Sequence, residues 1–361
     1  MTQIIKSLGK PNRFNFPSCC ITIDSFRGGE KLFLGYVHNF RALAIAFIVF
    51  GHCIDAFVWE GNATAERMLK IFISNGSTLF VFIAGYLFQH LSIKYNPKKY
   101  LETKFKNVIV PYLLISIPAI VVFTAFLDRE VVGLGFYDNP VWVQIMLFYM
   151  TGQHLAPLWF IPMIILFYLI APLLVRADSD GKIYYFLPLF IVISCFVERG
   201  LPFQSFVHFF SVYLLGMACS KYKDTLNTIF SDYKFITFSG ALIVIFASWE
   251  YYLDSGTMTW LNYLQKTVMS LFFLGLFYKF NNQLKSKFLN YVAEVSFGVF
   301  FLHSYFISGI KLLYNAVFYE LPVASVFSYL LFSIATFMSC LLLIFLIKKI
   351  TRKYSKFMIG C

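Results

Sequence analysis

The sequence predicts an all-α polytopic membrane protein, a bundle of about ten transmembrane helices with both termini in the cytoplasm. Three observations predict this fold: the composition, a series of long apolar runs, and the distribution of Lys and Arg. Of 361 residues, 59% are apolar and 13% are charged, and the mean hydropathy is +0.71. Soluble domains carry about 45–50% apolar and about 25% charged residues, so the excess is typical of membrane-spanning segments.

Ten apolar runs come close to the roughly 20 residues that a helix needs to cross a bilayer. We expect these helices at 40–58, 71–90, 108–126, 158–175, 183–198, 205–220, 235–252, 260–279, 291–310 and 323–347. A further run at 141–153 is apolar but too short to span, and we interpret it as an interfacial or re-entrant helix.

The distribution of basic residues supports this topology. With the N-terminus in the cytoplasm, the segments on that side hold 23 of the 30 Lys and Arg residues, and the outer segments hold 5. Cytoplasmic loops are enriched in Lys and Arg, and an odd number of spans would scramble the asymmetry. The predicted organisation is a cytoplasmic segment at 1–39, a membrane domain at 40–347 and a basic cytoplasmic tail at 348–361.

Other classes of protein are not indicated. A net charge of +12 fits loops that face anionic lipid, and no basic stretch interleaved with aromatics suggests nucleic-acid binding. The seven cysteines form no CxxC pair and have no His at zinc-ligand spacing, so we expect neither a metal site nor a disulfide framework. Residues 1–35 lack the continuous apolar segment of a signal peptide.

Ionisable side chains inside membrane spans are costly and are functional candidates by default. The predicted spans contain Arg41, His52, Asp55, His208, Lys266, Glu294 and His303. Arg41 and His52 are separated by about 16 Å along one helix axis and lie within about 20° of the same face. A guanidinium suits phosphate or carboxylate, and a neutral imidazole is the usual general base near pH 7. The alternative is a snorkelling Arg with a structural His.

Asp55 follows His52 on the same helix face, three residues on. Its carboxylate would hold the tautomer of the imidazole, as carboxylates do beside other His bases. We favour the alternative, a carboxylate solvated at the outer interface, because Asp55 lies near the end of the helix.

Six stretches stand out in order along the chain. They are R-x10-H in the first helix, LFVFIAGYLF (79–88), KFKNVIVPY (104–112), PLWFIPMIILFYLIAPLL (157–174), FFSVYLLGM (209–217) and VSFGVFFLH (295–303). In these stretches the chain resembles the acyltransferase-3 family of membrane acyltransferases. Ala84 replaces the Ser that usually precedes Gly in the second helix, and Lys104 and Lys106 stand in a run that typically holds two Arg.

The resemblance implies transfer of acyl groups, most often acetyl, from cytoplasmic acyl-CoA to sugars of surface polysaccharides, lipopolysaccharide or glycolipids. It implies a bacterial cytoplasmic (inner) membrane, acyl-CoA as co-substrate and no bound cofactor. Arg41, Lys104 and Lys106 would bind the donor, and His52 would act as the base with Arg41 beside the reacting groups. The resemblance leaves open whether transfer is direct or passes through an acyl-enzyme.

His303 and Trp159 are further candidates. If the apolar cores begin at Phe40 and Tyr291, His52 and His303 lie at a similar depth of about 18 Å. Two imidazoles at one level can act as a base and as a ligand for the thioester or the acceptor. The alternative for His303 is a structural hydrogen bond between helices, and Trp159 fits either sugar stacking or an aromatic belt.

Our interpretation is a membrane O-acyltransferase. The main alternative is a transporter or flippase of an envelope glycan that uses Arg41, His52 and Lys266 as a substrate path. A third interpretation is a non-catalytic partner in polysaccharide assembly. We see neither internal repeats nor Gly- or Pro-broken helix pairs, and both absences argue against a transporter.

The charge asymmetry makes the topology testable. Reporter fusions placed after residue 361 and within 91–107 should both report a cytoplasmic location, because these segments are among the most basic of the chain. An external signal from either fusion would contradict the ten-span topology.

Overall fold

The computed structural model describes residues 34–253 and 259–361, and the regular structure in these ranges is helical. The predicted all-α class is therefore confirmed. The helices are α1 (Gly35–Ile54), α2 (Ala63–Ile73), α3 (Ser77–Leu91), α4 (Pro97–Lys104), α5 (Val110–Ala125), α6 (Val141–Thr151), α7 (Phe160–Leu169), α8 (Ala171–Ser179), α9 (Leu187–Phe196), α10 (Pro202–Lys221), α11 (Lys223–Phe230), α12 (Tyr233–Leu253), α13 (Trp260–Lys279), α14 (Lys287–Phe318), α15 (Val326–Thr351) and α16 (Ser355–Ile359). Short 3₁₀ helices are η1 (Ser92–Lys94), η3 (Lys182–Phe186) and η4 (Arg352–Tyr354), and η2 (Phe105–Ile109) is a π-helical segment between α4 and α5.

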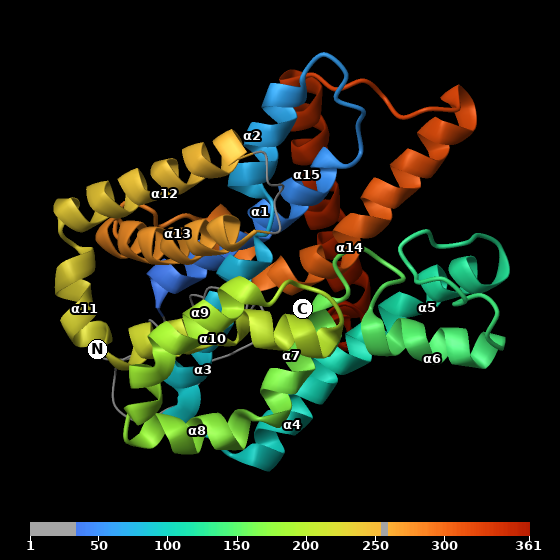
Figure 1. Ribbon diagram of the computed structural model, residues 1–361. Coiled ribbons are helices and arrows are strands. Elements are labelled where there is room, and N and C mark those ends of the chain that lie inside the picture. Colours follow the sequence, from blue (N-terminus) through green and yellow to red (C-terminus); the bar gives the residue numbers. More distant parts are fainter. Residues whose placement is uncertain (1–33, 254–258) are drawn as a thin grey trace, which may run out of the picture.

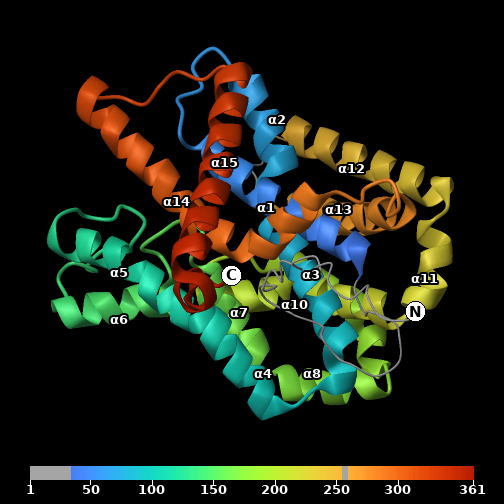
Figure 2. The ribbon, with the colours of Figure 1, turned by 180° about the vertical axis from the view of Figure 1, so that it is seen from behind.

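Helices α1, α3, α10 and α14 form the centre of the molecule (Figure 1). The antiparallel pair α12 and α13 flanks this centre on one side, and α5 and α6 flank it on the other, as the view from behind also shows (Figure 2). The loops that follow α1 and α14 meet in an isolated bridge between Val58 and Val323.

Seven helical segments in the described ranges are long and apolar enough to cross a membrane. They are Gly35–Ile54, Ala63–Lys94, Pro97–Ala125, Pro202–Lys221, Tyr233–Leu253, Lys287–Phe318 and Val326–Thr351. The bent pair α7 and α8 raises the number to eight if it is one span. The count of ten stays a prediction, because Lys182–Phe196 is shorter and because polar side chains near the start of α13 reduce its hydropathy.

Two predicted runs are interrupted. The run 158–175 forms α7 and α8, which meet at a bend of 53°. Pro172 lies at the start of α8, where its ring and missing N–H prevent a continuous helix. The run 71–90 is divided between α2 and α3 by a turn in which Asn75 has a φ of 62°. The expectation that no span is broken at Gly or Pro is therefore wrong, and it no longer argues against a transporter.

The turn between α2 and α3 is held by a buried cation. The Lys266 ammonium on α13 donates hydrogen bonds to the carbonyl oxygens of Ile71 (2.8 Å) and Phe72 (2.7 Å). The last carbonyls of a helix have no partner within the helix, and inside a membrane each of them needs one. Lys266 thus supplies the hydrogen bonds that allow α2 to end inside the protein.

Helices α3 and α10 touch backbone to backbone. A Cβ atom at Gly85 would overlap the carbonyl oxygen of Tyr213, and one at Gly216 would overlap that of Phe82. Small residues at a helix interface permit such an approach. Gly85 of the FIAGYLF stretch and Gly216 of the YLLG stretch therefore both lie in the contact between α3 and α10.

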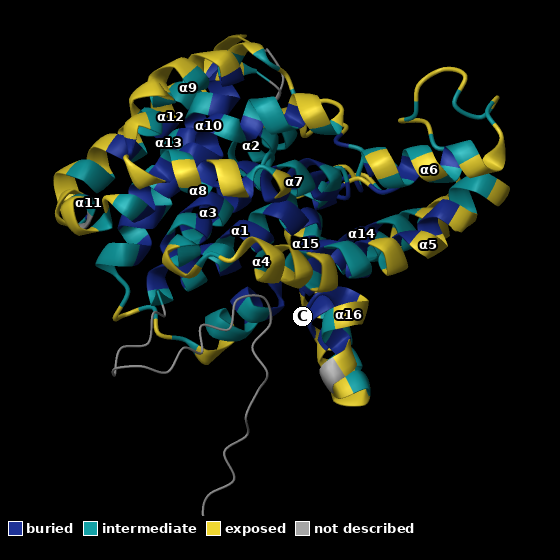
Figure 3. Cartoon of the chain, turned by 90° about the horizontal axis from the view of Figure 1, so that it is seen from below, coloured by how far each residue is buried: buried dark blue, intermediate teal, exposed yellow. Residues whose placement is uncertain are grey.

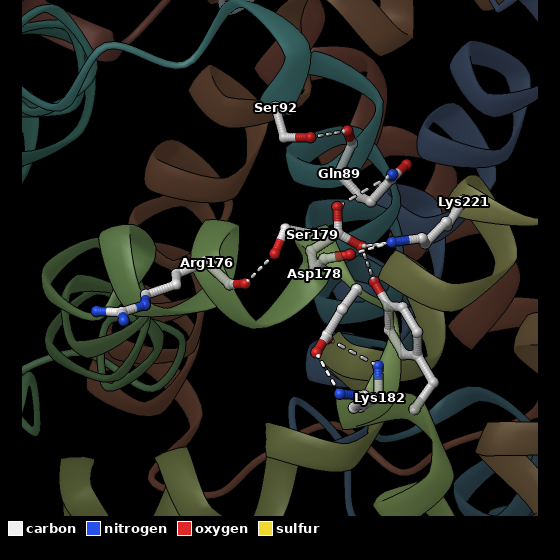
Figure 4. A network of polar contacts seen from close by, with 9 residues as sticks. Gln89, Ser92, Arg176, Asp178, Ser179, Lys182 and Lys221 are labelled. Carbon is white, nitrogen blue, oxygen red and sulfur yellow. Dashed lines mark hydrogen bonds and ion pairs between the residues drawn. The ribbon is translucent and has the colours of Figure 1, made fainter.

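A polar network ties the ends of α3, α8 and α10 together (Figure 4). The buried Asp178 carboxylate accepts hydrogen bonds from the Tyr184 hydroxyl (2.5 Å) and from Gln89 (3.4 Å). The Lys221 ammonium lies 3.4 Å from the same carboxylate. These contacts hold the three helix ends in register on the side predicted to face the cytoplasm.

The outer faces of several helices are apolar and exposed (Figure 3). On α12 these side chains are Phe238, Val244, Ile245, Trp249 and Tyr252, and α5 and α15 show comparable faces. Continuous exposed apolar surface of this kind is rare on soluble monomers. It fits contact with lipid.

We expect Gly85→Ala to destabilise the protein strongly. The added methyl group would overlap the Tyr213 carbonyl, and overpacking of this kind typically costs about 1–3 kcal/mol. The measurement is the melting temperature of purified protein in detergent. Gly309→Ala in α14 is the matched control, because a Cβ there meets no atom within 4 Å. Equal melting temperatures of the two variants would contradict the close contact of α3 and α10.

Candidate active site

Two imidazoles meet in the centre of the molecule. His52 near the end of α1 and His303 on α14 have ring centroids 5.4 Å apart, with the ring planes inclined by 37°. The two helices run side by side, and one end of this pairing is marked by a 3.2 Å contact between His38 Nε2 and the Asn290 carbonyl oxygen. The structure thus brings together the two histidines that the sequence puts at a common depth.

The hydrogen bonds of His303 define its tautomer. Its Nδ1 lies 3.0 Å from the carbonyl oxygen of Val299. A carbonyl only accepts hydrogen bonds, so Nδ1 carries the proton and Nε2 presents a lone pair. Nε2 is buried and has no hydrogen-bond partner in the described part of the chain. His52 is less enclosed than His303, which is fully buried.

A cavity of about 480 Å³ opens beside this centre. Its surface end carries exposed residues of η1 and α4, and its lining includes four cationic side chains: Arg41, Lys94, Lys99 and Lys104. No Asp or Glu of the described ranges lines it. The cavity is therefore strongly basic, and clefts of one charge concentrate ligands of the opposite charge.

Aromatic rings surround the basic end of the cavity. The Lys104 ammonium lies 5.3 Å from the ring centroid of Tyr100 and 4.9 Å from that of Tyr168. α4 begins close by, because the Asn96 side chain accepts a hydrogen bond from the Lys99 amide and Pro97 occupies the first turn. A flat base and several phosphates would find both stacking surfaces and cations here.

The inner end of the cavity is apolar. Its lining there consists of Phe80, Ile83, Ala84, Phe160, Ile164 and Phe297. The rings of Phe160 and Phe300 lie 5.5 Å apart, and the Phe300 ring lies 6.2 Å from that of His303. Two ring contacts therefore lead from the apolar wall of the cavity to His303. Along α14, Phe297 and His303 are about 9 Å apart.

Two of the three predicted donor-binding residues line the cavity, and the third does not. Arg41 lies six residues inside α1, about 9 Å from its start, and lines the cavity together with Lys104. Lys106 is exposed and does not line the cavity. The sequence spacing already indicated this difference between Lys104 and Lys106, because residues two apart do not share a helix face. Lys94 and Lys99 line the cavity although sequence analysis did not single them out.

The surroundings of Asp55 and Trp159 do not support a direct role in the chemistry at His52. The Asp55 side chain is exposed, and no hydrogen bond joins it to His52 in the part of the chain that the structure describes. The Trp159 ring stacks on Phe209 with centroids 5.9 Å apart, and the guanidinium of Arg199 lies 5.2 Å from its centroid. Trp159 thus packs between an aromatic ring and a cation.

Lys266 lines neither of the two cavities found among the described residues. It is fully buried, and its ammonium donates to two backbone carbonyls. This location supports a structural role and weakens the hypothesis of a transporter that uses Lys266.

An all-helical membrane bundle with a basic cavity beside paired imidazoles defines the class of protein. The model of the acyltransferase-3 family, described as an acyltransferase domain, matches residues 34–358. The chain therefore belongs to the acyltransferase-3 family, as its motifs predict, and is a membrane acyltransferase. No curated protein and no solved structure gives a significant match.

Proposed function

We propose that the protein transfers an acyl group from acyl-CoA to a hydroxyl group of a carbohydrate. The observation that carries this proposal is the cavity of about 480 Å³, which has four cationic side chains in its lining and an apolar wall connected to His303, the neighbour of His52, by the ring contacts of Phe160 and Phe300. Cationic side chains suit the phosphates of coenzyme A. The apolar inner wall suits its thioester arm.

The donor would enter from the cytoplasm. Lys94, Lys99 and Lys104 belong to the segment 91–107, which the charge distribution assigns to the cytoplasmic side. Arg41 would contact the donor deeper in the cavity, where its fork can bind a phosphate or a carbonyl oxygen. Lys106 would contribute less, as an exposed charge outside the lining.

In the proposed reaction, the His52 imidazole accepts the proton of the acceptor hydroxyl while the hydroxyl oxygen attacks the thioester carbonyl carbon. The new C–O bond forms, the C–S bond breaks, and the proton passes to the leaving thiolate, so that coenzyme A departs as a thiol. The lone pair on His303 Nε2 can accept a hydrogen bond from the imidazolium that forms on His52, the role that a carboxylate has in other His bases.

We further propose acetyl as the acyl group and a sugar of a surface polysaccharide, lipopolysaccharide or glycolipid as the acceptor. The protein would lie in a bacterial cytoplasmic membrane with ten spans and both termini inside. Family membership supports the reaction class. The 23-to-5 distribution of basic residues supports the topology.

Donor binding should depend on Lys104 more than on Lys106. Lys104→Gln removes a cation from the cavity lining, whereas Lys106→Gln changes an exposed side chain outside it. We expect about a tenfold weaker affinity for coenzyme A in Lys104→Gln, in the range of one charged hydrogen bond, and a smaller change in Lys106→Gln. Calorimetric titration of purified protein with coenzyme A measures both. An equal effect of the two substitutions would count against this cavity as the donor site.

Catalysis should depend on His52. His52→Gln keeps size and hydrogen-bonding capacity but cannot accept a proton at neutral pH, and loss of a general base typically costs about 10²–10⁴-fold in rate. The measurement is the base-labile ester content of the surface glycan, with normal membrane insertion of the variant verified.

His154→Gln is the matched control for His52→Gln. His154 is buried more completely than His52, its Nδ1 lies 3.1 Å from a backbone carbonyl oxygen, and it packs against Tyr112 and lines neither cavity. This variant should retain its activity. Near-normal esterification in His52→Gln would overturn the assignment of the base.

A further inference from the structure

A second, much smaller cavity lies at the start of α3. Its volume is about 20 Å³, and polar side chains line it: Asn75, Thr78, Arg199, His208, Asn262 and Tyr263. A space of this size holds one water molecule or one hydroxyl group. None of these residues lines the large cavity.

The same two helices connect both cavities. On α3, Thr78 lines the small cavity, and Phe80, Ile83 and later residues line the large one. On α10, His208 lines the small cavity and Tyr213 lines the large one. The small cavity therefore lies at the start of α3, and the large one begins about half a helical turn further on and extends to the end of that helix.

His52 lies at the level of the small cavity. A Cβ atom on the preceding residue, Gly51, would be 3.5 Å from the Cα atom of Ser74 in the turn between α2 and α3. Asn75 in that same turn lines the small cavity. His52 is not among the lining residues, but it follows the residue that packs against the turn from which Asn75 enters the lining.

Arg199 is the cation of this cavity, and its position is fixed by its neighbours. Its guanidinium lies 5.2 Å from the centroid of the Trp159 ring and 3.4 Å from the Ser77 hydroxyl. Burial lowers its pKa to about 10, so it stays charged at neutral pH. It is close enough to His52 and His208 to act on both electrostatically.

The remaining lining is pre-organised by a buried network. The Asn262 amide donates to the Glu250 carboxylate at 3.0 Å, and its oxygen accepts a 2.6 Å hydrogen bond from Asn75. His208 Nδ1 lies 2.6 Å from the Val197 carbonyl oxygen, which fixes that imidazole in turn. Polar groups held in this way retain their geometry without a ligand.

We propose that this small cavity is the acceptor subsite, where a sugar hydroxyl enters and Arg199 donates hydrogen bonds to oxygen atoms of the acceptor. This inference rests on the proposed function. Amide, hydroxyl and guanidinium groups are the partners that a polyhydroxylated ligand requires. The reacting hydroxyl fills the cavity, and the sugar ring remains at its outer edge. The acceptor and the donor then approach His52 from two different cavities.

The test measures labelled acetyl transfer from acetyl-CoA to the surface glycan of the host after mild base has removed its esters. Purified protein in lipid nanodiscs is compared with Arg199→Gln and Arg199→Lys. We expect Arg199→Gln to raise the KM for the glycan by at least about tenfold, the range for loss of a charged hydrogen bond, with the KM for acetyl-CoA unchanged. Arg199→Lys keeps the charge but loses the bidentate guanidinium. Its KM for the glycan should therefore lie between those of the unmodified protein and Arg199→Gln.

Arg129→Gln is the matched control. Arg129 is also half-buried, and its guanidinium lies 5.3 Å from the Phe123 ring centroid, but on the loop between α5 and α6. It should change neither KM. An unchanged KM for the glycan in Arg199→Gln, or an equal rise in the KM for acetyl-CoA, would overturn the acceptor subsite while the proposed function stands.

Two further outcomes are also decisive. If Arg199→Gln does not accumulate as folded protein, Arg199→Lys decides the question by the same criterion. Absence of transfer by the unmodified protein would refute the proposed function itself, and the acceptor subsite with it.

Discussion

The backbone contact of α3 and α10 at Gly85 and Gly216 is the constraint on which the site depends. Both cavities are lined by these two helices, so their separation sets the width of each. Apolar side chains gain little by leaving lipid for a protein interior, and close packing must therefore hold membrane helices together. The two glycines provide that packing where a side chain of any size would separate the helices.

Irregular backbone is concentrated around the site, and each irregularity has a physical compensation. α2 ends against the buried Lys266 ammonium, and α8 begins at Pro172. In a bilayer such breaks are tolerated where protein or a cavity surrounds the freed polar groups. The turn between α2 and α3 then lies beside His52 and lines the small cavity, so the break contributes to the site.

Much of the fold and part of the site were predictable from sequence. The apolar runs predict the bounds of α12 and α13 to within two residues, because a membrane helix needs little more than length and hydropathy. His52 and His303 were predicted at one depth because two parallel helices that start at the same membrane face advance by the same rise per residue. Both arguments use only local information.

The features that sequence analysis missed are tertiary. Hydropathy continues through the turn at Asn75, so nothing in the apolar pattern marks the end of α2. Arg199 lies in a short loop, where no periodicity predicts the direction of a side chain, and Trp159 and Ser77 orient it from distant parts of the chain. The hydrogen bonds of Lys266 to the terminal carbonyls of α2 can be recognised only when the relative positions of α2 and α13 are known.

The separation of the two cavities has a consequence for the cell. No residue lines both of them, and a continuous opening between them would be a water-filled pore. Such a pore would let protons and ions leak down the membrane potential, which acts on every charge that crosses. On the inner side of the large cavity, the Phe160 ring packs on Phe300 and the Phe300 ring packs on His303. Rings packed in this way oppose a leak of ions at the place where the reaction is proposed.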